Sequence, residues 1–323
     1  MNKEIKRFGS GTVVDGLREY GIYLALVLLI LFFSIQIPAF RTTSNALLVL
    51  LQVSVIGIIA VGMTMTIICA GIDLSVGALL AVASVMSGLF AQMEPTMGTM
   101  ALAFIVPVVV GICGGAINGA IIAGANVNPL IVTLGTMTAF RGFVVWFRIN
   151  PIYNLQPFFS WVGQGSLLGI PVPVLVFCAV AVAASVLLNL TRFGRYVYAV
   201  GGNREAARAA GVNVRLVIFS VYALSGLCVG IASLISTSRL MAAQATAGQG
   251  FELQAIAAAV IGGASLFGGR GRISNTVVGA LIMGVLFNGF VMLGVPQPIQ
   301  QVFVGAIIIA AVWADGVMRR KPV

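Results

Sequence analysis

Hydrophobic residues fill this chain in long runs, and polar residues are confined to short breaks between them. A membrane-spanning helix needs about 20 apolar residues, and shorter runs are typical of re-entrant or broken helices. The pattern predicts ten apolar segments, at approximately 20–37, 46–70, 74–93, 99–123, 129–147, 172–188, 216–235, 253–269, 274–293 and 299–315. We therefore expect an all-α, polytopic membrane helical bundle of about ten transmembrane helices, some of them short or broken.

The segments predict a single transmembrane domain over residues 20–315, with a polar segment at 1–19 and a tail at 316–323. The first apolar run lacks a small-residue cleavage site and is followed by Pro38, so we expect a retained span rather than a removed signal peptide. Spans two to five and seven to ten have equal numbers and would run in opposite directions. This is the arrangement of an inverted repeat, although the two sequences show no clear self-similarity.

Composition supports a membrane protein. The chain is 60% hydrophobic and only 8% charged, whereas about a quarter of the residues of a soluble domain are charged. Its net charge of +10 comes from basic residues near the ends and in short loops. That distribution favours contact with anionic lipid headgroups and gives no support to nucleic-acid binding.

The distribution of Lys and Arg also predicts an orientation. If the N-terminus is cytoplasmic and ten spans alternate, most basic residues fall inside, and those outside are Arg41, Arg148 and Arg239. Cytoplasmic loops concentrate Lys and Arg. We therefore expect a multi-pass protein of the cell (inner) membrane with both termini in the cytoplasm.

The residue inventory argues against an enzyme. The chain has no histidine, and its only lysines are Lys3, Lys6 and Lys321. A phosphate-binding loop needs a lysine beside glycine-rich backbone, and a serine or cysteine nucleophile needs a base, so neither site is expected. No metal site or bound cofactor is predicted. All four cysteines lie in apolar runs, where we expect buried small hydrophobic residues rather than disulfides: Cys69, Cys113, Cys178 and Cys228.

The stretch 191–215 carries five arginines between two apolar runs, which indicates a cytoplasmic loop. Asn203 is a suitable N-cap, Glu205 places negative charge near the positive end of a helix, and Gly211 suits a C-terminal stop. We expect a short helix there, too small to fold alone and suited to a groove on another protein.

Two polar breaks interrupt the apolar pattern. The first, at 70–77, contains Asp73, whose carboxylate is costly in a membrane unless it has a partner or water. The second is the glycine-rich stretch 261–272, for which a break lining a cavity and a tight cytoplasmic turn are both open. Either could act as a hinge or gate support.

Several polar residues within or beside the spans are candidates for a translocation path or gate. A neutral solute such as a sugar needs hydroxyl and amide partners, whereas hydrogen bonding between helices is the competing interpretation. Arg141 has the further alternatives of reaching the outer interface or bonding backbone carbonyls. The candidates are Asp73, Asn118, Asn128, Thr133, Thr136, Arg141 and Asn288.

With these segments in view, the chain resembles the permease subunits of ribose-type sugar ABC importers, a family that includes ribose, xylose, arabinose and galactose permeases. The resemblance rests on AVGMTMTIICAGIDLSVGALLA (60–81), NPLIVTLGTMTAFRG (128–142), TRFGRYVYAVGGNREAARAAGVNV (191–214), YALSGL (222–227), ELQAIAAAVIGGASLFGGRGRI (252–273) and VGALIMGVLFNGFVMLGV (278–295). The stretch 143–158, on the predicted outer face, departs from the family pattern, so ribose itself is not assumed.

The resemblance implies a transport subunit that imports a monosaccharide, a ribose-like pentose or a hexose, without modifying it. It implies a dimer with an identical or related permease, an extracytoplasmic sugar-binding protein, and a cytoplasmic ABC ATPase that holds ATP and Mg. The loop at about 189–215 matches the family's ATPase-coupling loop, with Asn203, Arg204, Glu205, Ala206, Ala207, Arg208 and Gly211. The alternative function is an ion-coupled secondary transporter, for which the chain offers few ionisable groups.

Overall fold

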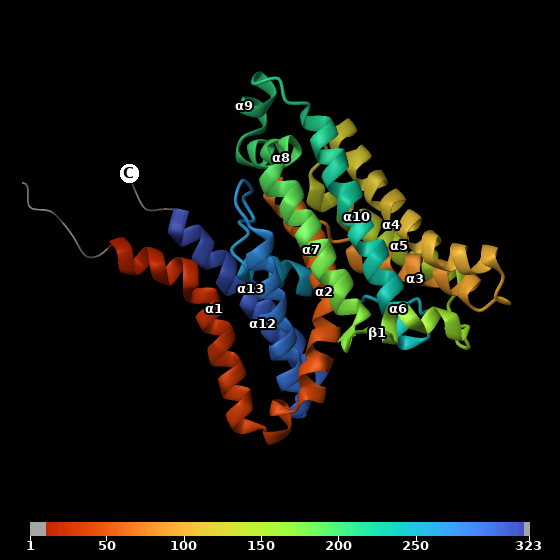
Figure 1. Ribbon diagram of the computed structural model, residues 1–323. Helices are drawn as coiled ribbons and strands as arrows, with labels where there is room; N and C mark the ends of the chain where they lie inside the picture. The colour runs from red at the N-terminus through yellow and green to blue at the C-terminus, as the bar shows by residue number, and fades with distance from the viewer. Residues whose placement is uncertain (1–10, 320–323) are drawn as a thin grey trace, which may run out of the picture.

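The computed structural model describes residues 11–319, and they form an almost entirely helical bundle (Figure 1). The helices are α1 (Gly11–Gln36), α2 (Thr43–Ile68), α3 (Val76–Ala91), α4 (Met97–Ala125), α5 (Pro129–Phe147), α6 (Ser160–Gln164), α7 (Val172–Leu190), α8 (Arg192–Gly202), α9 (Arg204–Ala209), α10 (Val214–Leu240), α11 (Phe251–Ile261), α12 (Ile273–Met292) and α13 (Gln297–Arg319). Two 3-10 helices, η1 (Pro38–Arg41) and η2 (Pro157–Phe159), and an antiparallel pair of strands, β1 (Ser166–Leu167) and β2 (Ile170–Pro171), complete the fold, with Ser166 opposite Pro171.

The predicted apolar segments all fall on helices, so the all-α membrane class is confirmed. In the described part of the chain, six helices are long and apolar enough to cross a membrane: α2, α4, α5, α7, α10 and α12. Four other apolar stretches are shorter, at Gly21–Gln36, Val76–Ala91, Phe251–Ile261 and Gln297–Trp313. The eighth predicted segment, 253–269, is longer than the helix it predicts, because α11 ends at Ile261 and residues 262–272 form a turn.

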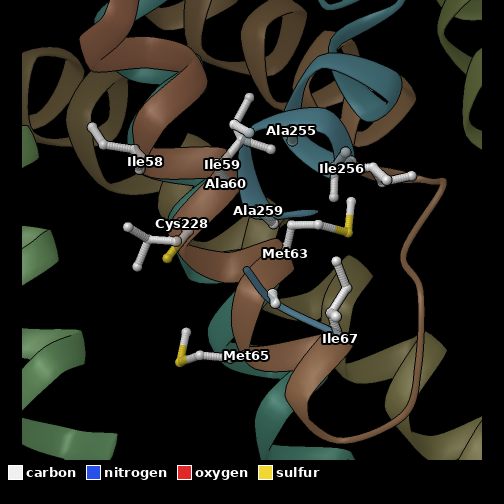
Figure 2. Close-up of a cluster of buried hydrophobic side chains, with 14 of the residues drawn as sticks. Ile58, Ile59, Ala60, Met63, Met65, Ile67, Cys228, Ala255, Ile256 and Ala259 are labelled. Carbon is white, nitrogen blue, oxygen red and sulfur yellow. The ribbon is translucent and has the colours of Figure 1, made fainter. Parts of the chain in front are cut away.

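Two long helices, α2 and α10, form the centre of the bundle and pack against each other. Figure 2 shows the apolar core around α2, with Ile59, Met63 and Ile67 close to side chains of α11 and with Cys228 of α10 nearby. All four cysteines are free. Cys69 and Cys228 are buried as predicted, but Cys113 and Cys178 are exposed on the surface of this chain.

Helix α10 also packs closely on α4 through glycines. A side chain added at Gly226 would meet the carbonyl of Gly111, and one added at Gly230 would meet the backbone at Pro107 and Val108. Between apolar helices in lipid, small residues allow close backbone approach and provide van der Waals contact. Gly111, Gly226 and Gly230 therefore mark the place where α4 and α10 cross.

The chain is built as two similar halves. In each half a long central helix, α2 or α10, ends near a left-handed residue, Ala70 (φ 57°) or Met241 (φ 47°). An irregular segment and a shorter helix follow, which is α3 with 16 residues or α11 with 11 residues. Two more helices then complete each half, α4 and α5 or α12 and α13. The two halves therefore share the same order of elements.

The two ends of the bundle differ. Helices α8 and α9 lie together at one end, and the turn between α1 and α2 lies at the other end, toward which α6 and β1 are also placed (Figure 1). The predicted polar segment 1–19 and tail 316–323 lie partly outside the described residues.

Candidate translocation and coupling sites

The first break, residues 69–75, is organised by a buried carboxylate. Asp73 is completely buried, and its Oδ1 accepts hydrogen bonds from the backbone N–H of Ser75 (3.1 Å) and the hydroxyl of Ser75 (2.6 Å). Its Oδ2 accepts from the hydroxyl of Ser225 on α10 at 3.3 Å. The carboxylate lies just before α3, where the positive end of a helix favours negative charge. Asp73 therefore stabilises the start of α3 and ties it to α10.

Two other candidates converge on the same break. The amide Nδ2 of Asn118 on α4 donates to the Ser75 hydroxyl at 2.8 Å. The hydroxyl of Thr133 on α5 donates to the carbonyl of Ile72 at 3.1 Å, and the hydroxyl of Tyr222 on α10 reaches the same carbonyl at 3.3 Å. Side chains from α4, α5 and α10 thus satisfy backbone and side-chain groups that would otherwise be unpaired at membrane depth.

The remaining amide and hydroxyl candidates lie elsewhere and have local partners. Asn128 caps α5, since its Oδ1 accepts from the N–H of Leu130 at 2.9 Å. Thr136 donates to the carbonyl of Thr133 at 3.3 Å, one turn back on the same helix. Asn288 on α12 donates to Asn45 on α2 at 2.9 Å. Asn128 thus caps a helix, Thr136 bonds within its own helix, and Asn288 joins two helices. None of the three forms a site with Asp73.

Arg141 holds a further irregular segment, residues 241–250 between α10 and α11, which sequence patterns missed. We call this segment the second break, and the glycine-rich stretch 261–272 the α11–α12 turn. Its guanidinium donates to the carbonyls of Ala245 (2.5 Å) and Ala247 (3.2 Å), one of the alternatives left open by the sequence. Ile152, in the stretch that departs from the family pattern, pairs with Ala243 through two backbone hydrogen bonds of 2.8 and 2.9 Å. The loop after α5 therefore holds this break through Ile152, and α5 itself holds it through Arg141.

The glycine-rich stretch 261–272 is a turn between α11 and α12, which is one of the two interpretations that the sequence left open. The N–H of Gly269 donates to the carbonyl of Ile68 at the end of α2 (2.8 Å), and the hydroxyl of Tyr198 on α8 donates to the carbonyl of Gly271 (2.8 Å). The turn thus joins α2 and α8 at the end of the bundle that carries α8 and α9.

The two breaks bring the starts of the short helices together. A side chain added at Gly77, in the first turn of α3, would meet the carbonyl of Gly248 and the carboxylate of Glu252 at the start of α11. Gly248 itself has a left-handed backbone (φ 69°), which glycine adopts without strain. Close approach of the two helix starts therefore requires glycine on both sides.

Two adjacent cavities lie beside the second break, in the described part of the chain. One, of about 210 Å³, is lined by α2, α10, α11 and α12 and includes Gln52, Arg239 and Gln254. The other, of about 520 Å³, lies between α11, α12 and α13, and its polar lining is largely glutamine. These residues were not among the predicted candidates. Glutamines spaced by three or four positions at 297, 300 and 301, within an otherwise apolar helix, were the available signal.

The predicted short helix of the arginine-rich loop is α9, and its capping is as expected. The Oδ1 of Asn203 accepts from the N–H of Ala206 at 3.0 Å, and Gly211 follows the helix with a left-handed backbone (φ 82°). Ala207 is buried and anchors the helix. Glu205 and Arg208 form an ion pair of 2.9 Å, with their side chains 80% and 59% exposed. The pair therefore lies on the exposed surface of α9.

Comparison with known proteins places the chain in a family. Residues 45–312 match the family model described as branched-chain amino acid transport system / permease component. The chain belongs to this family. The permease is 45% identical over 305 residues to the ribose import permease protein RbsC of Bacillus subtilis, which covers 93% of this chain and 94% of the relative.

Other relatives are similar over comparable lengths. The D-allose transport system permease protein AlsC of Escherichia coli is 40% identical over 301 residues, 92% of the permease and 91% of the relative. The xylose transport system permease protein XylH of the same species is 34% identical, over 97% of the permease and 95% of the relative. No solved structure matches the chain.

Proposed function

We propose that this permease is the membrane subunit of an ATP-driven ABC importer that moves a monosaccharide into the cytoplasm. The observation that carries the proposal is the similarity, over more than nine tenths of the chain, to import permeases named for ribose and D-allose. The family description names branched-chain amino acids, but the relatives with the greatest identity reported above are sugar permeases.

The proposal includes ten membrane crossings with both termini in the cytoplasm. The four shorter apolar helices would complete the count, with α3 and α11 crossing only part of the bilayer and the irregular segments before them crossing the rest. Excess arginine at α8 and α9 supports placing that end of the bundle inside. The outer loop with α6 and the β1–β2 pair would then face the sugar-binding protein.

The ATP would be bound and hydrolysed by a separate ATPase with its Mg, since the sequence has no lysine beside glycine-rich backbone. Its docking surface would be the arginine-rich segment of α8 and α9, where Asn203, Arg204, Glu205, Ala206, Ala207, Arg208 and Gly211 form or flank α9. A second permease copy, identical or related, would complete the pore. Lipid surrounds the rest.

Uptake into proteoliposomes tests the function. The permease is reconstituted with its ATPase and binding protein, and uptake of labelled D-ribose, D-allose and D-xylose is measured with and without ATP. We expect uptake of at least one sugar that requires ATP and persists when ionophores remove proton and sodium gradients. Uptake that depends on a gradient and not on ATP would instead establish the ion-coupled alternative.

A further inference from the structure

The cavity beside the second break combines a few polar groups with apolar walls. Its volume is about 210 Å³, and four helices contribute to it. Gln52 comes from α2, Arg239 from α10, Gln254 from α11, and the rings of Phe251 and Phe287 lie among the apolar lining. A concave, mostly apolar site with a small number of convergent polar groups is the usual form of a small-molecule site.

This cavity lies at about the middle of the bundle. Gly262, at the end of α11, packs against the start of α12, and the 11 residues of α11 rise about 16 Å, half of a hydrocarbon layer of about 30 Å. Gly284, midway along α12, packs against Val53, the neighbour of Gln52. Gln254 and Gln52 therefore lie near the bilayer centre when α2 and α12 span it.

Polar side chains at that depth need partners, because unsatisfied polar groups are costly in lipid. In the part of the chain that the structure describes, the polar residues at the breaks have such partners, and those that line the cavity do not. Asp73, Thr133 and Arg141 all have protein partners at the breaks. Within the described residues, the side chains of Gln52, Gln254 and Arg239 have no hydrogen bond or ion pair with the protein. Their hydrogen-bonding capacity is left for water or a ligand in the cavity.

The neighbouring hollow of about 520 Å³ continues this polar surface. It shares Gln254 and Phe287 with the smaller cavity. Its other polar lining residues are Gln249, Glu252, Gln297, Gln300 and Gln301. Most of the polar residues that line the two volumes are therefore neutral glutamines, joined by one serine, Ser236, and by one arginine and one carboxylate of opposite charge.

We propose that the cavity lined by Gln52 and Gln254 binds the transported solute, a neutral polyhydroxylated molecule of monosaccharide size. This inference rests on the proposed import function. An amide both donates and accepts hydrogen bonds, as a sugar hydroxyl does, and a guanidinium adds donors. The rings of Phe251 and Phe287 offer apolar surface to the carbon face of a sugar. The larger hollow is the adjoining part of its path.

Transport by the assembled importer tests the site. Gln254→Met keeps the length of the side chain and removes its amide, and Gln36→Met, on an exposed glutamine at the end of α1 that lines neither cavity, is the matched control. The loss of one hydrogen bond lowers a binding equilibrium constant by roughly three- to tenfold. We expect the labelled D-ribose moved per ATP hydrolysed to fall by at least about threefold in Gln254→Met, further when Gln52→Leu is added, and to stay at the wild-type value in the control.

A second measurement covers variants that fold poorly. Gln254→Cys is made in a chain whose natural cysteines are alanine, and its reaction with a small methanethiosulfonate reagent is followed in the importer. We expect D-ribose to slow the reaction, and an equal concentration of betaine, which carries no hydroxyl groups, to leave it unchanged. Wild-type uptake with a normal ratio in Gln254→Met, or protection by anionic lipid but not by ribose, would overturn the site. Failure of the wild type to transport any of the three sugars would instead overturn the import function.

Discussion

Replacing Asp73 by alanine tests whether the first break is a structural clamp or part of a translocation path. The carboxylate accepts three hydrogen bonds, two from Ser75 and one from Ser225. Ser225 lies within α10, so its hydroxyl can bond a carbonyl of its own helix instead. The two groups of Ser75 would be left buried without an acceptor, at about 1–3 kcal/mol each. We therefore expect Asp73→Ala to lose about 2–6 kcal/mol of stability.

Asparagine should be tolerated far better. Its Oδ1 can still accept from both groups of Ser75, and its amide can donate to the hydroxyl of Ser225. What is lost is the extra strength of a charged acceptor, about half of each bond. We expect Asp73→Asn to cost about 1 kcal/mol, and Glu94→Ala, on an exposed loop residue, to cost nothing measurable.

The melting temperatures of Asp73→Ala, Asp73→Asn and Glu94→Ala can be compared in detergent. The fraction of folded permease that remains after heating is measured by fluorescence-detected gel filtration. A change of about 1 kcal/mol shifts Tm by about 2–4 °C for chains of this size class. Asp73→Ala should therefore melt at least about 4 °C below the wild type, and Asp73→Asn should melt between the two. The clamp is refuted if Asp73→Asn abolishes uptake at unchanged Tm, because the charge would then be used in transport, as in an ion-coupled carrier.

Three further predictions concern other parts of the chain. Replacing Glu205 and Arg208 together with alanine should leave Tm unchanged, because the pair is exposed, but lower uptake relative to ATP hydrolysis. Gly226→Leu should force α10 from α4 and abolish recovery of folded protein, whereas Gly124→Leu, in open space, should not. Tyr198→Phe should lower the free energy of unfolding by about 1 kcal/mol in a denaturant titration. Burial raises the pKa of Tyr198, so this stability is present below pH about 10 and is lost as pH rises through the raised value.

Much of the fold was predictable because apolar runs and arginine-rich loops follow directly from the bilayer. Asn203, Glu205 and Gly211 also predicted α9, since helix caps depend on local chemistry. The position of the second break was not predictable in this way. Its residues, 241–250, are uncharged and mostly small, and the backbone groups of Ala243 and Ala245 are bonded by Ile152 and Arg141, which are distant in sequence.

The candidate path residues show a similar limit. Conspicuous polar residues such as Asp73 and Asn118 connect helices inside the bundle: the Asp73 carboxylate accepts from Ser75, and the Nδ2 of Asn118 donates to the Ser75 hydroxyl. Gln52 and Gln254 could not be identified as site residues from the sequence, because each lies in a largely apolar helix. Only the packing of four helices brings them to one cavity.

The carbonyl of Ile68 has a mechanical consequence for the whole bundle. Gly269 donates a hydrogen bond to it from the second half, and Gly201 of α8 packs against it so closely that no side chain fits between them. The end of α2, helix α8 and the turn after α11 thus meet at this one carbonyl. We therefore expect a displacement of α8 to move the end of α2 and the turn after α11 together, so that both halves of the chain respond at this one carbonyl.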